Sequence, residues 1–499
     1  MYLLGYDIGS SSIKAALVDA ETGATISVVQ HPPTEMAIQA PKPGWAEQHP
    51  ETWWDSVCAA THQLLAQTGI AAGDIRGVGI SYQMHGLVVV DKNQQALRPS
   101  IIWCDSRAVE IGNRAFEAIG PEICLQHLLN SPGNFTASKL RWVQENEPDI
   151  YRRIDLFMLP GDYIAMRLTG EAMTTPGGLS EGICWDFLKD DVAGLVLDHY
   201  GIDRGLIPAI VPAVSLQGQL TQAAAQATGL RAGIPVAYRA GDQPNNALAL
   251  NALQPGEAAA TGGTSGVVYG VVDQPAYDLQ SRVNGFAHVN HSKDRPRIGI
   301  LLCINGCGIQ YAWVRQRFAQ NGIPYAEMEQ QAAAIPVGSE GLRILPFGNG
   351  AERMLANRDP GAQINNLQFN RHTNAHFFRA ALEGIAFSFV YGVQILSEMG
   401  VPVSVLRVGN DNLFQSAVFS TTLANLLGCS IQMVETTGAV GAAKAAGVAT
   451  GIYPTLEAAV GNNKVLRTFN PQPGAGQYEA AYQAWAADLE KIEPGGPGQ

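Results

Sequence analysis

Apolar residues near the N-terminus fall into three short runs that are separated by polar or glycine-rich turns. The runs span residues 3–7, 13–19 and 25–30, and their lengths and composition are those of β-strands. They predict a three-stranded meander. Along the rest of the chain strand-like segments alternate with helical ones, and this order is typical of an α/β fold.

Segments with helical spacing and segments with strand-like composition follow one another through the rest of the chain. Apolar residues at helical spacing predict helices over 50–67, 245–251, 310–320 and 375–399. Strands are predicted at 75–81, 101–103, 236–238 and 405–408, with residues 88–91 as the hairpin partner of the strand before them. Residues 121–203 are expected to be mostly helical with loops, and the tail after Ala486, which closes with 494–498, to be frayed.

One strand–turn–strand pattern occurs twice. Residues 9–13 align with 263–267, and the match continues without a gap from 17–19 to 271–273. Backbone N–H groups of such a turn can cradle phosphate oxygens, and Asp7, which only the first copy carries, could hold a divalent cation. Two ordinary β-hairpins with glycine at the turn are the alternative. The repeat suggests two similar lobes that face each other across a cleft.

Length and composition describe an ordinary globular protein. The chain has 499 residues, 46% of them apolar and 15% charged, which fits two or three domains. We place the main boundary in the turn at 254–257, because that segment lacks apolar residues. The expected division is 1–250 for the N-terminal lobe, 251–460 for the C-terminal lobe, and 461–499 for a C-terminal helix and frayed tail.

Charge and targeting signals narrow the possible partners. A net charge of −12 argues against nucleic acid and against an anionic membrane surface. We expect no signal peptide and no membrane helix, because no basic and apolar leader and no apolar window of ~18 residues is found. The seven cysteines are scattered, which favours free thiols in a reducing cytoplasm.

Candidate ligand-binding residues follow several predicted strands, at the strand ends where ligands bind in α/β sheets. These residues are Gln83, Met84 and His85 after 75–81, Asp105 and Arg107 after 101–103, Asp242 and Gln243 after 236–238, and Gly409 and Asn410 after 405–408.

These motifs resemble the FGGY family of carbohydrate kinases, over roughly residues 1–450. The resemblance runs through the Asp-Ile-Gly-Ser-Ser opening, Gln83-Met84-His85-Gly86, Trp103-Cys104-Asp105-Ser106-Arg107, residues 135–143, Gly241-Asp242, Gly263-Thr264-Ser265-Gly266, Leu382-Glu383-Gly384 and the small-residue run from Gly438. The Gln-Met-His-Gly stretch is most similar to xylulokinases, in which the Met and His contact the ketose. Xylulokinases commonly carry Asn where this chain has Gln243, and residues 409–414 replace the glycine-rich adenosine stretch of many members.

The resemblance implies a fold of two actin/hexokinase-like (ribonuclease H-like) lobes, with ATP and Mg²⁺ across the central cleft. Asp242 is then the catalytic base, and Asp7 and Asp242 are the metal ligands. The expected sugar contacts are Gln83, Met84, His85, Asp105 and Gln243. The expected nucleotide contacts are Gly9, Ser10, Ser11, Lys14, Gly263, Thr264, Gly409, Asn410 and Gly438.

Phosphoryl transfer to a hydroxyl needs a carboxylate that accepts the proton, which suits the role of Asp242. Each candidate also has a structural alternative. Asp242 could be a helix N-cap, His85 an interior histidine, Met84 core filler, and Lys139 a solvated lysine. Asp105 and Arg107 could form a local ion pair of little energetic weight.

The expected activity is ATP-dependent phosphorylation of D-xylulose to D-xylulose 5-phosphate in the cytoplasm. Because of Gln243, a kinase for another pentulose, a polyol or glycerol stays an alternative. Two other classes are a non-catalytic sugar- or nucleotide-binding regulator and an actin-like filament subunit. The oligomeric state is left open, with a homodimer as one option.

Overall fold

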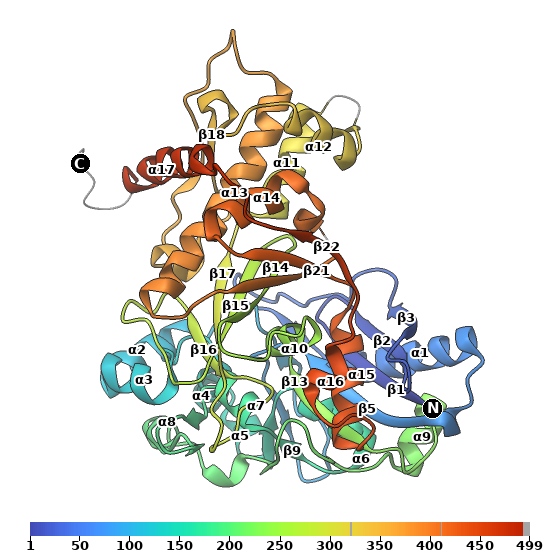
Figure 1. The fold of residues 1–499 in the computed structure, drawn as a ribbon. Coiled ribbons are helices and arrows are strands. Elements are labelled where there is room, and N and C mark those ends of the chain that lie inside the picture. Colours follow the sequence, from blue (N-terminus) through green and yellow to red (C-terminus); the bar gives the residue numbers. More distant parts are fainter. Residues whose placement is uncertain (320–321, 411, 493–499) are drawn as a thin grey trace.

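The computed structural model describes residues 1–319, 322–410 and 412–492. Two β-sheets form the centres of its two halves (Figure 1). The first sheet has the order β13-β5-β1-β2-β3, with β1 (Tyr2–Ile8), β2 (Ile13–Asp19), β3 (Thr25–His31), β5 (Ile75–Tyr82) and β13 (Val236–Gly241). The second has the order β16-β17-β15-β14-β20-β21-β22, with β14 (Glu257–Gly262), β15 (Gly266–Val272), β16 (Asn284–Ala287), β17 (Ile298–Ile304), β20 (Val405–Gly409), β21 (Ser430–Val434) and β22 (Val465–Phe469).

The two sheets share one topology. In the first, an antiparallel meander β3-β2-β1 continues into β5 and β13, which run parallel to β1. In the second, β17-β15-β14 repeats the meander, and β20 and β21 repeat the two parallel strands. Both copies of the repeated turn therefore lie in equivalent hairpins, β1–β2 and β14–β15. The predicted duplication is confirmed for five strands of each sheet, and β16 and β22 of the second sheet have no counterpart in the first.

The first half of the chain, up to residue 249, contains ten α-helices. They are α1 (Pro50–Thr68), α2 (Val109–Ile119), α3 (Pro121–Leu128), α4 (Thr136–Asn146), α5 (Pro148–Tyr151), α6 (Pro160–Thr169), α7 (Pro176–Glu181), α8 (Gly194–Tyr200), α9 (Gln222–Thr228) and α10 (Asp242–Ala249). The predicted helix at 50–67 is confirmed. The His49 side chain accepts a hydrogen bond from Glu51 N at its start, and Gly69 ends it in the left-handed conformation, as such caps require.

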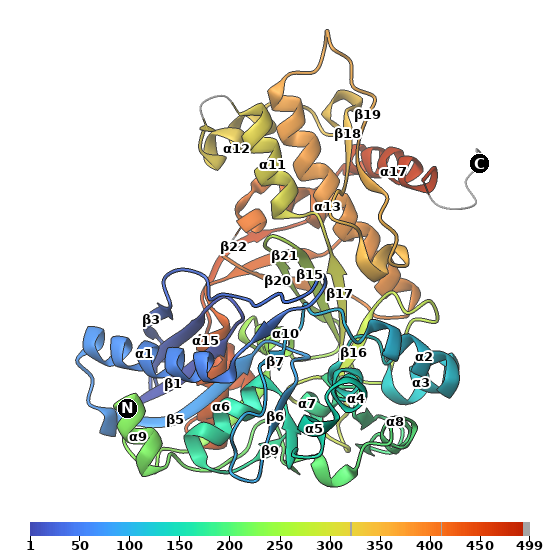
Figure 2. The same ribbon diagram turned by 180° about the vertical axis from the view of Figure 1, so that it is seen from behind.

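The helices of the second half include the longest in the described chain. They are α11 (Gly308–Phe318), α12 (Tyr325–Ala333), α13 (Asn374–Glu398), α14 (Ala417–Leu427), α15 (Gly438–Ala449), α16 (Leu456–Val460) and α17 (Gly476–Glu490). Helix α13 packs on β15 and β17 with α11 beside it (Figure 2). By length and composition α13 could cross a membrane, but 83% of its most apolar window is buried inside the protein. Its apolar surface therefore belongs to the core.

Short strand pairs connect the remaining segments. They are β4 (Glu47–Gln48) with β7 (Ser100–Ile101), β6 (Val88–Val90) with β8 (Leu156–Met158), β9 (Met173–Thr174) with β12 (Ala209–Ile210), β10 (Trp185–Asp186) with β11 (Asp191–Val192), and β18 (Arg343–Phe347) with β19 (Gly361–Asn365).

Three local predictions need correction. Residues 88–91 were expected to pair with the strand before them, but β6 pairs with β8, which lies about 70 residues later. The helix expected from residue 245 already begins at Asp242, because Pro244 is accommodated in its first turn. Helix α17 continues past Ala486 to Glu490, and 494–498 lie outside the described residues.

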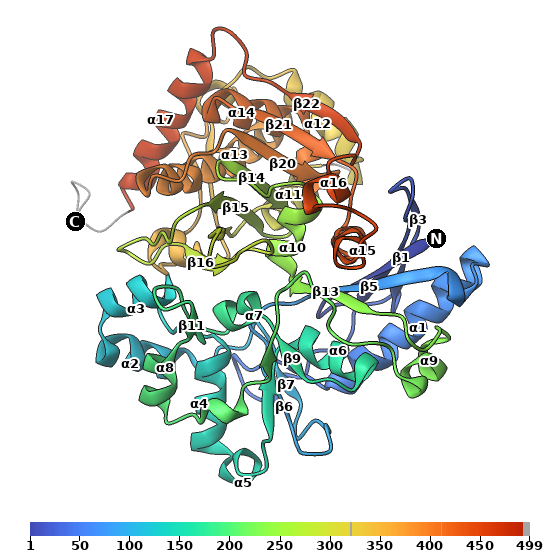
Figure 3. The ribbon, with the colours of Figure 1, turned by 60° about the horizontal axis from the view of Figure 1, so that its bottom comes forward.

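Helix α15 comes from the second half of the chain but lies on β1 and β5 of the first sheet (Figure 3). Two glycines in these strands permit the contact. A Cβ atom added at Gly5 would lie 1.9 Å from Ala439 O, and one added at Gly79 would lie 1.9 Å from Ala442 O. The backbone of the helix therefore rests directly on the backbone of the sheet.

We predict that Gly79→Ala displaces α15 and lowers the free energy of unfolding by about 3 kcal/mol, because backbone atoms cannot move away as a flexible side chain can. Thermal unfolding measures the loss. Gly476→Ala is the matched control, since a Cβ there meets nothing within 4 Å, and its melting temperature should stay near that of the wild type. Equal stability of both variants would contradict the close contact.

Candidate active site

The carboxyl ends of β1, β5 and β13 bring two acidic residues together. Asp7 is the next-to-last residue of β1, and Asp242 directly follows β13 as the first residue of α10. In the sheet register Asp7 pairs with Ser81, and Gly241 pairs with Tyr82. Ser81 Oγ donates a hydrogen bond to Asp7 Oδ1 at 3.0 Å. The parallel order of the three strands therefore sets the position of both carboxyl groups.

Both carboxyl groups have perturbed proton affinities. Burial and the negative charge of Asp7 raise the pKa of Asp242 from 3.8 to about 7. Burial raises the pKa of Asp7 as well, although Lys14 and the Ser81 hydroxyl oppose that shift. Two neighbouring like charges in a partly desolvated place are unfavourable unless a cation lies with them. Carboxylate oxygens are also the ligands that Mg²⁺ prefers, so the pair fits a divalent cation.

The first repeated turn lies next to Asp7. Gly9 N donates a hydrogen bond to Ser12 O at 3.1 Å, and Trp103 Nε1 donates to Ser10 Oγ at 3.3 Å. Ser11 is exposed, as is Lys14 on the strand opposite Asp7. Hydroxyl groups and an ammonium group are therefore available at this turn for an anionic ligand.

The second repeated turn contacts the start of α11. Gly308 N donates a hydrogen bond to Gly263 O at 2.9 Å, and Ile309 N donates to Thr264 O at 3.4 Å. Gly409 ends β20, the parallel neighbour of β14. The structure thus brings Gly263, Thr264, Gly409 and Asn410 to one edge of the second sheet.

Gly438 is not at that edge. It is the first residue of α15, and a Cβ added to it would lie 2.9 Å from Asp7 Oδ2 and 3.1 Å from Asn246 Oδ1. Asn245 Nδ2 donates a hydrogen bond to Gly438 O at 2.9 Å. The positive end of the α15 dipole therefore faces the Asp7 carboxylate.

The predicted sugar contacts after β5 lie in the interior. Gln83 is 3% exposed, and neither atom of its side-chain amide has a hydrogen-bond partner within the described chain. The His85 ring lies 4.8 Å from the Phe135 ring and 5.4 Å from the Phe286 ring, measured between centroids. His85 Nδ1 donates to Glu181 O at 2.9 Å. Burial lowers the pKa of His85 to about 3, so its imidazole is neutral.

Lys139 is a buried residue, which corrects the expectation of a solvated lysine. Its side chain has no exposed surface, and its Nζ donates to His85 O at 2.9 Å and to Ile102 O at 3.0 Å. Burial lowers the pKa of Lys139 to about 7, and the charge of Asp105 opposes this shift. The ammonium group therefore ties together two of the predicted ligand-facing strand ends. Lys139 lies on α4, and the amphipathic sequence of this helix does not indicate that the face with Lys139 is buried.

Asp105 is fully buried in an ion pair with Arg107, at 2.6 Å between Oδ2 and Nη2. Its Oδ2 also accepts a hydrogen bond from Ala46 N at 2.5 Å. The Arg107 guanidinium also lies 3.7 Å from the Trp45 ring centroid. Arg107 N and Nε each donate a hydrogen bond to Oδ1 at 2.9 Å, so the protein engages both carboxylate oxygens. Contact of Asp105 with a sugar stays a prediction.

Two further residues lie beside His85, although no sequence motif predicted them. Glu181, at the end of α7, has the backbone oxygen that His85 contacts, and Phe286 on β16 brings the second sheet against the His85 ring. Met84, Glu181, Gly241, Pro244 and Phe286 line one small cavity. Only the fold brings them together, because Phe286 is 201 residues from His85 in the sequence.

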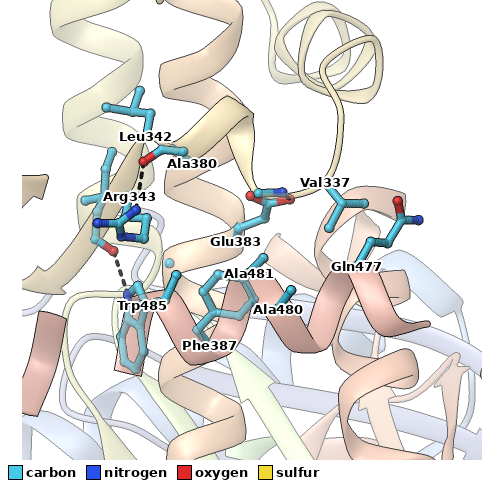
Figure 4. A pocket seen from close by; sticks show the side chains of 15 residues that line it. Val337, Leu342, Arg343, Ala380, Glu383, Phe387, Gln477, Ala480, Ala481 and Trp485 are labelled. Atoms are coloured by element: carbon cyan, nitrogen blue, oxygen red, sulfur yellow. Dashed lines mark hydrogen bonds between the residues drawn. The ribbon is translucent and has the colours of Figure 1, made fainter. Parts of the chain in front are cut away.

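A larger pocket, of about 370 Å³, lies in the second half between α13 and α17 (Figure 4). Arg343, Glu383, Phe387 and Trp485 are among its lining residues, and none of the predicted site residues is. The Glu383 carboxylate there accepts hydrogen bonds from Gly338 N, Ser339 Oγ and Arg379 Nε. The Glu383 carboxylate is therefore already bound by the protein, and this pocket contains none of the predicted site residues.

Domain models of one protein family match most of the chain. Residues 2–249 match the N-terminal domain of the FGGY family of carbohydrate kinases, and residues 258–450 match its C-terminal domain. A xylulose kinase of Bacillus subtilis is 29% identical over 476 residues, covering 91% of this chain and 90% of the relative. The L-xylulose/3-keto-L-gulonate kinase of Escherichia coli is 31% identical and covers 97% of this chain and 96% of its own.

Solved structures show the same architecture. The crystal structure of xylulose kinase from Rhodospirillum rubrum superposes with a TM-score of 0.89 at 25% identity, covering 99% of each chain. The two-lobed actin/hexokinase-like α/β fold expected from the sequence is therefore confirmed.

The raised pKa of Asp242 predicts a pH-dependent stability. Because the folded protein holds this proton more tightly than the unfolded chain, the contribution of Asp242 to stability is full below pH 3.8 and is lost as the pH rises to about 7. Asp242→Asn removes that loss. Without metal or nucleotide, its melting temperature should exceed that of the wild type by roughly 2–4 °C at pH 8 and by less at pH 5. A variant that melts below the wild type at both pH values would contradict this.

Proposed function

We propose that this chain, which belongs to the FGGY family of carbohydrate kinases, transfers the γ-phosphoryl group of ATP to D-xylulose and forms D-xylulose 5-phosphate. ATP-dependent phosphorylation of a sugar follows from the family. D-Xylulose as the acceptor is supported by relatives that are named xylulose kinases and match over most of the chain. The observation that carries the mechanism is the position of Asp242 beside Asp7, with a pKa raised to about 7.

Asp242 acts as the general base. As the oxygen of the acceptor hydroxyl forms its bond to the γ-phosphorus, its proton moves to the Asp242 carboxylate, and ADP leaves with the electron pair of the broken P–O bond. A pKa near 7 suits this role, because the group is ionised often enough to accept the proton and basic enough to keep it.

Asp7 and Asp242 would hold Mg²⁺, which when bound neutralises charge on the β- and γ-phosphate oxygens. The two hairpin turns would bind those oxygens, through Gly9, Ser10, Ser11 and Lys14 on one side and Gly263 and Thr264 on the other. Gly409 and Asn410 would contact the rest of the nucleotide, and the N-terminus of α15 at Gly438 would add a positive dipole near Asp7.

The acceptor would lie against Gln83, Met84, His85 and Gln243. Gln83 supports this because its buried amide has no partner in the described chain, and a buried amide without a partner is unfavourable unless a ligand satisfies it. Residues 1–250 would then carry the sugar site and base, and 251–460 most of the ATP site. We expect the enzyme to act on these two small molecules in the cytoplasm.

A panel of acceptors tests the proposal. In a coupled assay of ADP release, kcat/KM for D-xylulose should exceed that for D-ribulose, glycerol and gluconate by about tenfold or more, since a missing or misplaced hydroxyl leaves polar groups of the site unpaired. L-Xylulose and 3-keto-L-gulonate belong in the panel because of the Escherichia coli relative. Higher activity on any other acceptor would overturn D-xylulose as the substrate.

The same assay includes Asp242→Asn. Its turnover of the best acceptor should fall by ~10²–10⁴, whereas its sugar affinity should change far less, because the amide keeps the shape but cannot take the proton. Turnover near the wild-type value would show that another group is the base.

His85→Ala tests the acceptor site. Loss of a neutral imidazole that binds a sugar hydroxyl should raise the KM for the sugar severalfold to about a hundredfold, with the KM for ATP nearly unchanged. A lower melting temperature together with an unchanged sugar KM would instead assign His85 a structural role, through its bond to Glu181 O.

A further inference from the structure

Glu181 has a buried carboxyl group that makes no hydrogen bond of ordinary geometry within the described residues. The residue is 1% exposed, and neither of its carboxyl oxygens has a hydrogen-bond partner among residues 1–319, 322–410 and 412–492. The Tyr82 hydroxyl lies beside it and opposes the rise in the pKa of Glu181 through a weak side-chain interaction, although the two groups do not reach ordinary hydrogen-bond geometry. A group in this state is typical of a functional site, because burial of an unsatisfied polar group costs stability.

The carboxyl group points towards the start of α10. Glu181 Oε2 lies 2.8 Å from the position of a Cβ added at Gly241, and Met84 Cγ lies 2.6 Å from the same position. Gly241 directly precedes Asp242. The side chain therefore reaches the place where the proposed base and one proposed sugar contact meet.

The backbone of Glu181 is also part of this site. Its carbonyl oxygen accepts the hydrogen bond from His85 Nδ1. Its side chain lines the small cavity that Met84, Gly241 and Phe286 share. Arg239, buried in the same wall, forms an ion pair with Asp162 at 3.2 Å between Nε and Oδ1, although its guanidinium nitrogens have no hydrogen bond of ordinary geometry within the described residues.

Charge decides which form of the carboxyl group is present. Burial and the negative charge of Asp242 raise the pKa of Glu181 well above its usual range. A protonated carboxyl group has one O–H donor and one carbonyl acceptor. It can therefore bind an alcohol or a carbonyl oxygen without adding a third negative charge beside Asp7 and Asp242.

We propose that the Glu181 side chain hydrogen-bonds an oxygen atom of the acceptor sugar and selects acceptors that carry this oxygen. The proposal rests on the proposed function, since it concerns the same acceptor. Glu181 takes no part in proton transfer. It positions and selects the substrate, so its removal should act on sugar affinity more than on turnover.

Two variants test this in the full-length enzyme. Glu181→Ala should raise the dissociation constant of the sugar, measured by calorimetry without ATP, by about 10- to 100-fold. The sugar KM should rise in parallel, with the KM for ATP within about twofold. Glu181→Gln should stay within about threefold of the wild type in both sugar constants, because an amide also offers a donor and an acceptor.

Glu383→Gln is the matched control. Glu383 is 2% exposed, but its carboxylate is fully bound by the protein and lies in the pocket between α13 and α17 (Figure 4). This variant should melt at a lower temperature and bind the sugar as tightly as the wild type does. It separates the effect of changing a buried glutamate from the effect of losing a sugar contact.

The outcomes also separate this proposal from the proposed function. If Glu181→Ala binds the sugar as tightly as the wild type, or only lowers the melting temperature, Glu181 does not contact the sugar. If Glu181→Gln is as weak as Glu181→Ala, binding through a neutral carboxyl group is wrong. If the panel shows another preferred acceptor, the assignment of D-xylulose as the substrate is wrong. The variant-to-wild-type ratios of the dissociation constant and the KM, measured with that acceptor, then decide the role of Glu181. If no acceptor binds, both proposals fail.

Discussion

The site depends on the direct backbone contact between α15 and the first sheet. Gly5 and Gly79 have no side chains to separate the helix from β1 and β5, and at Gly441 a Cβ would lie 2.5 Å from Ala249 Cβ on α10. Helix α15, helix α10 and the first sheet thus pack together with no side chains larger than a methyl group between them at these positions. Because α15 belongs to the second half of the chain, this contact links the two halves, and it places the N-terminus of α15 against Asp7.

Around this contact the structure maintains an unfavourable arrangement of charge. Asp7, Asp242 and Glu181 are carboxyl groups that burial makes hard to ionise, and His85 nearby is held neutral. Perturbed pKa values of this kind concentrate at functional sites. Such an arrangement lowers the stability of the folded protein, and the packing of the rest of the structure has to offset that loss.

In a neighbouring network, by contrast, each charged group has a partner of opposite charge or a hydrogen-bond acceptor. Arg107 lies between Asp105 and Glu47, with salt bridges of 2.6 and 2.7 Å. Arg98 continues the network to Glu47 and Glu147, and Lys139 ties His85 O to Ile102 O. These charges are paired and hold the strand ends in place. By contrast, the carboxyl oxygens of Glu181 have no hydrogen bond of ordinary geometry among the described residues, and Asp242 lies beside the like charge of Asp7.

The features that could be predicted from the sequence are local. The hairpins β1–β2 and β14–β15, helices α1 and α13, and the position of Asp242 after a strand all follow from periodicity and turn chemistry that act within a few residues. The repeated turn also indicated two related sheets. The pairing of β6 with β8, the burial of Lys139, the cavity around Glu181 and the contact of α15 with Gly5 could not be predicted in this way. Each of them joins residues that lie tens to hundreds of positions apart. Only the tertiary structure decides them, because burial and pairing depend on which distant surface covers a residue.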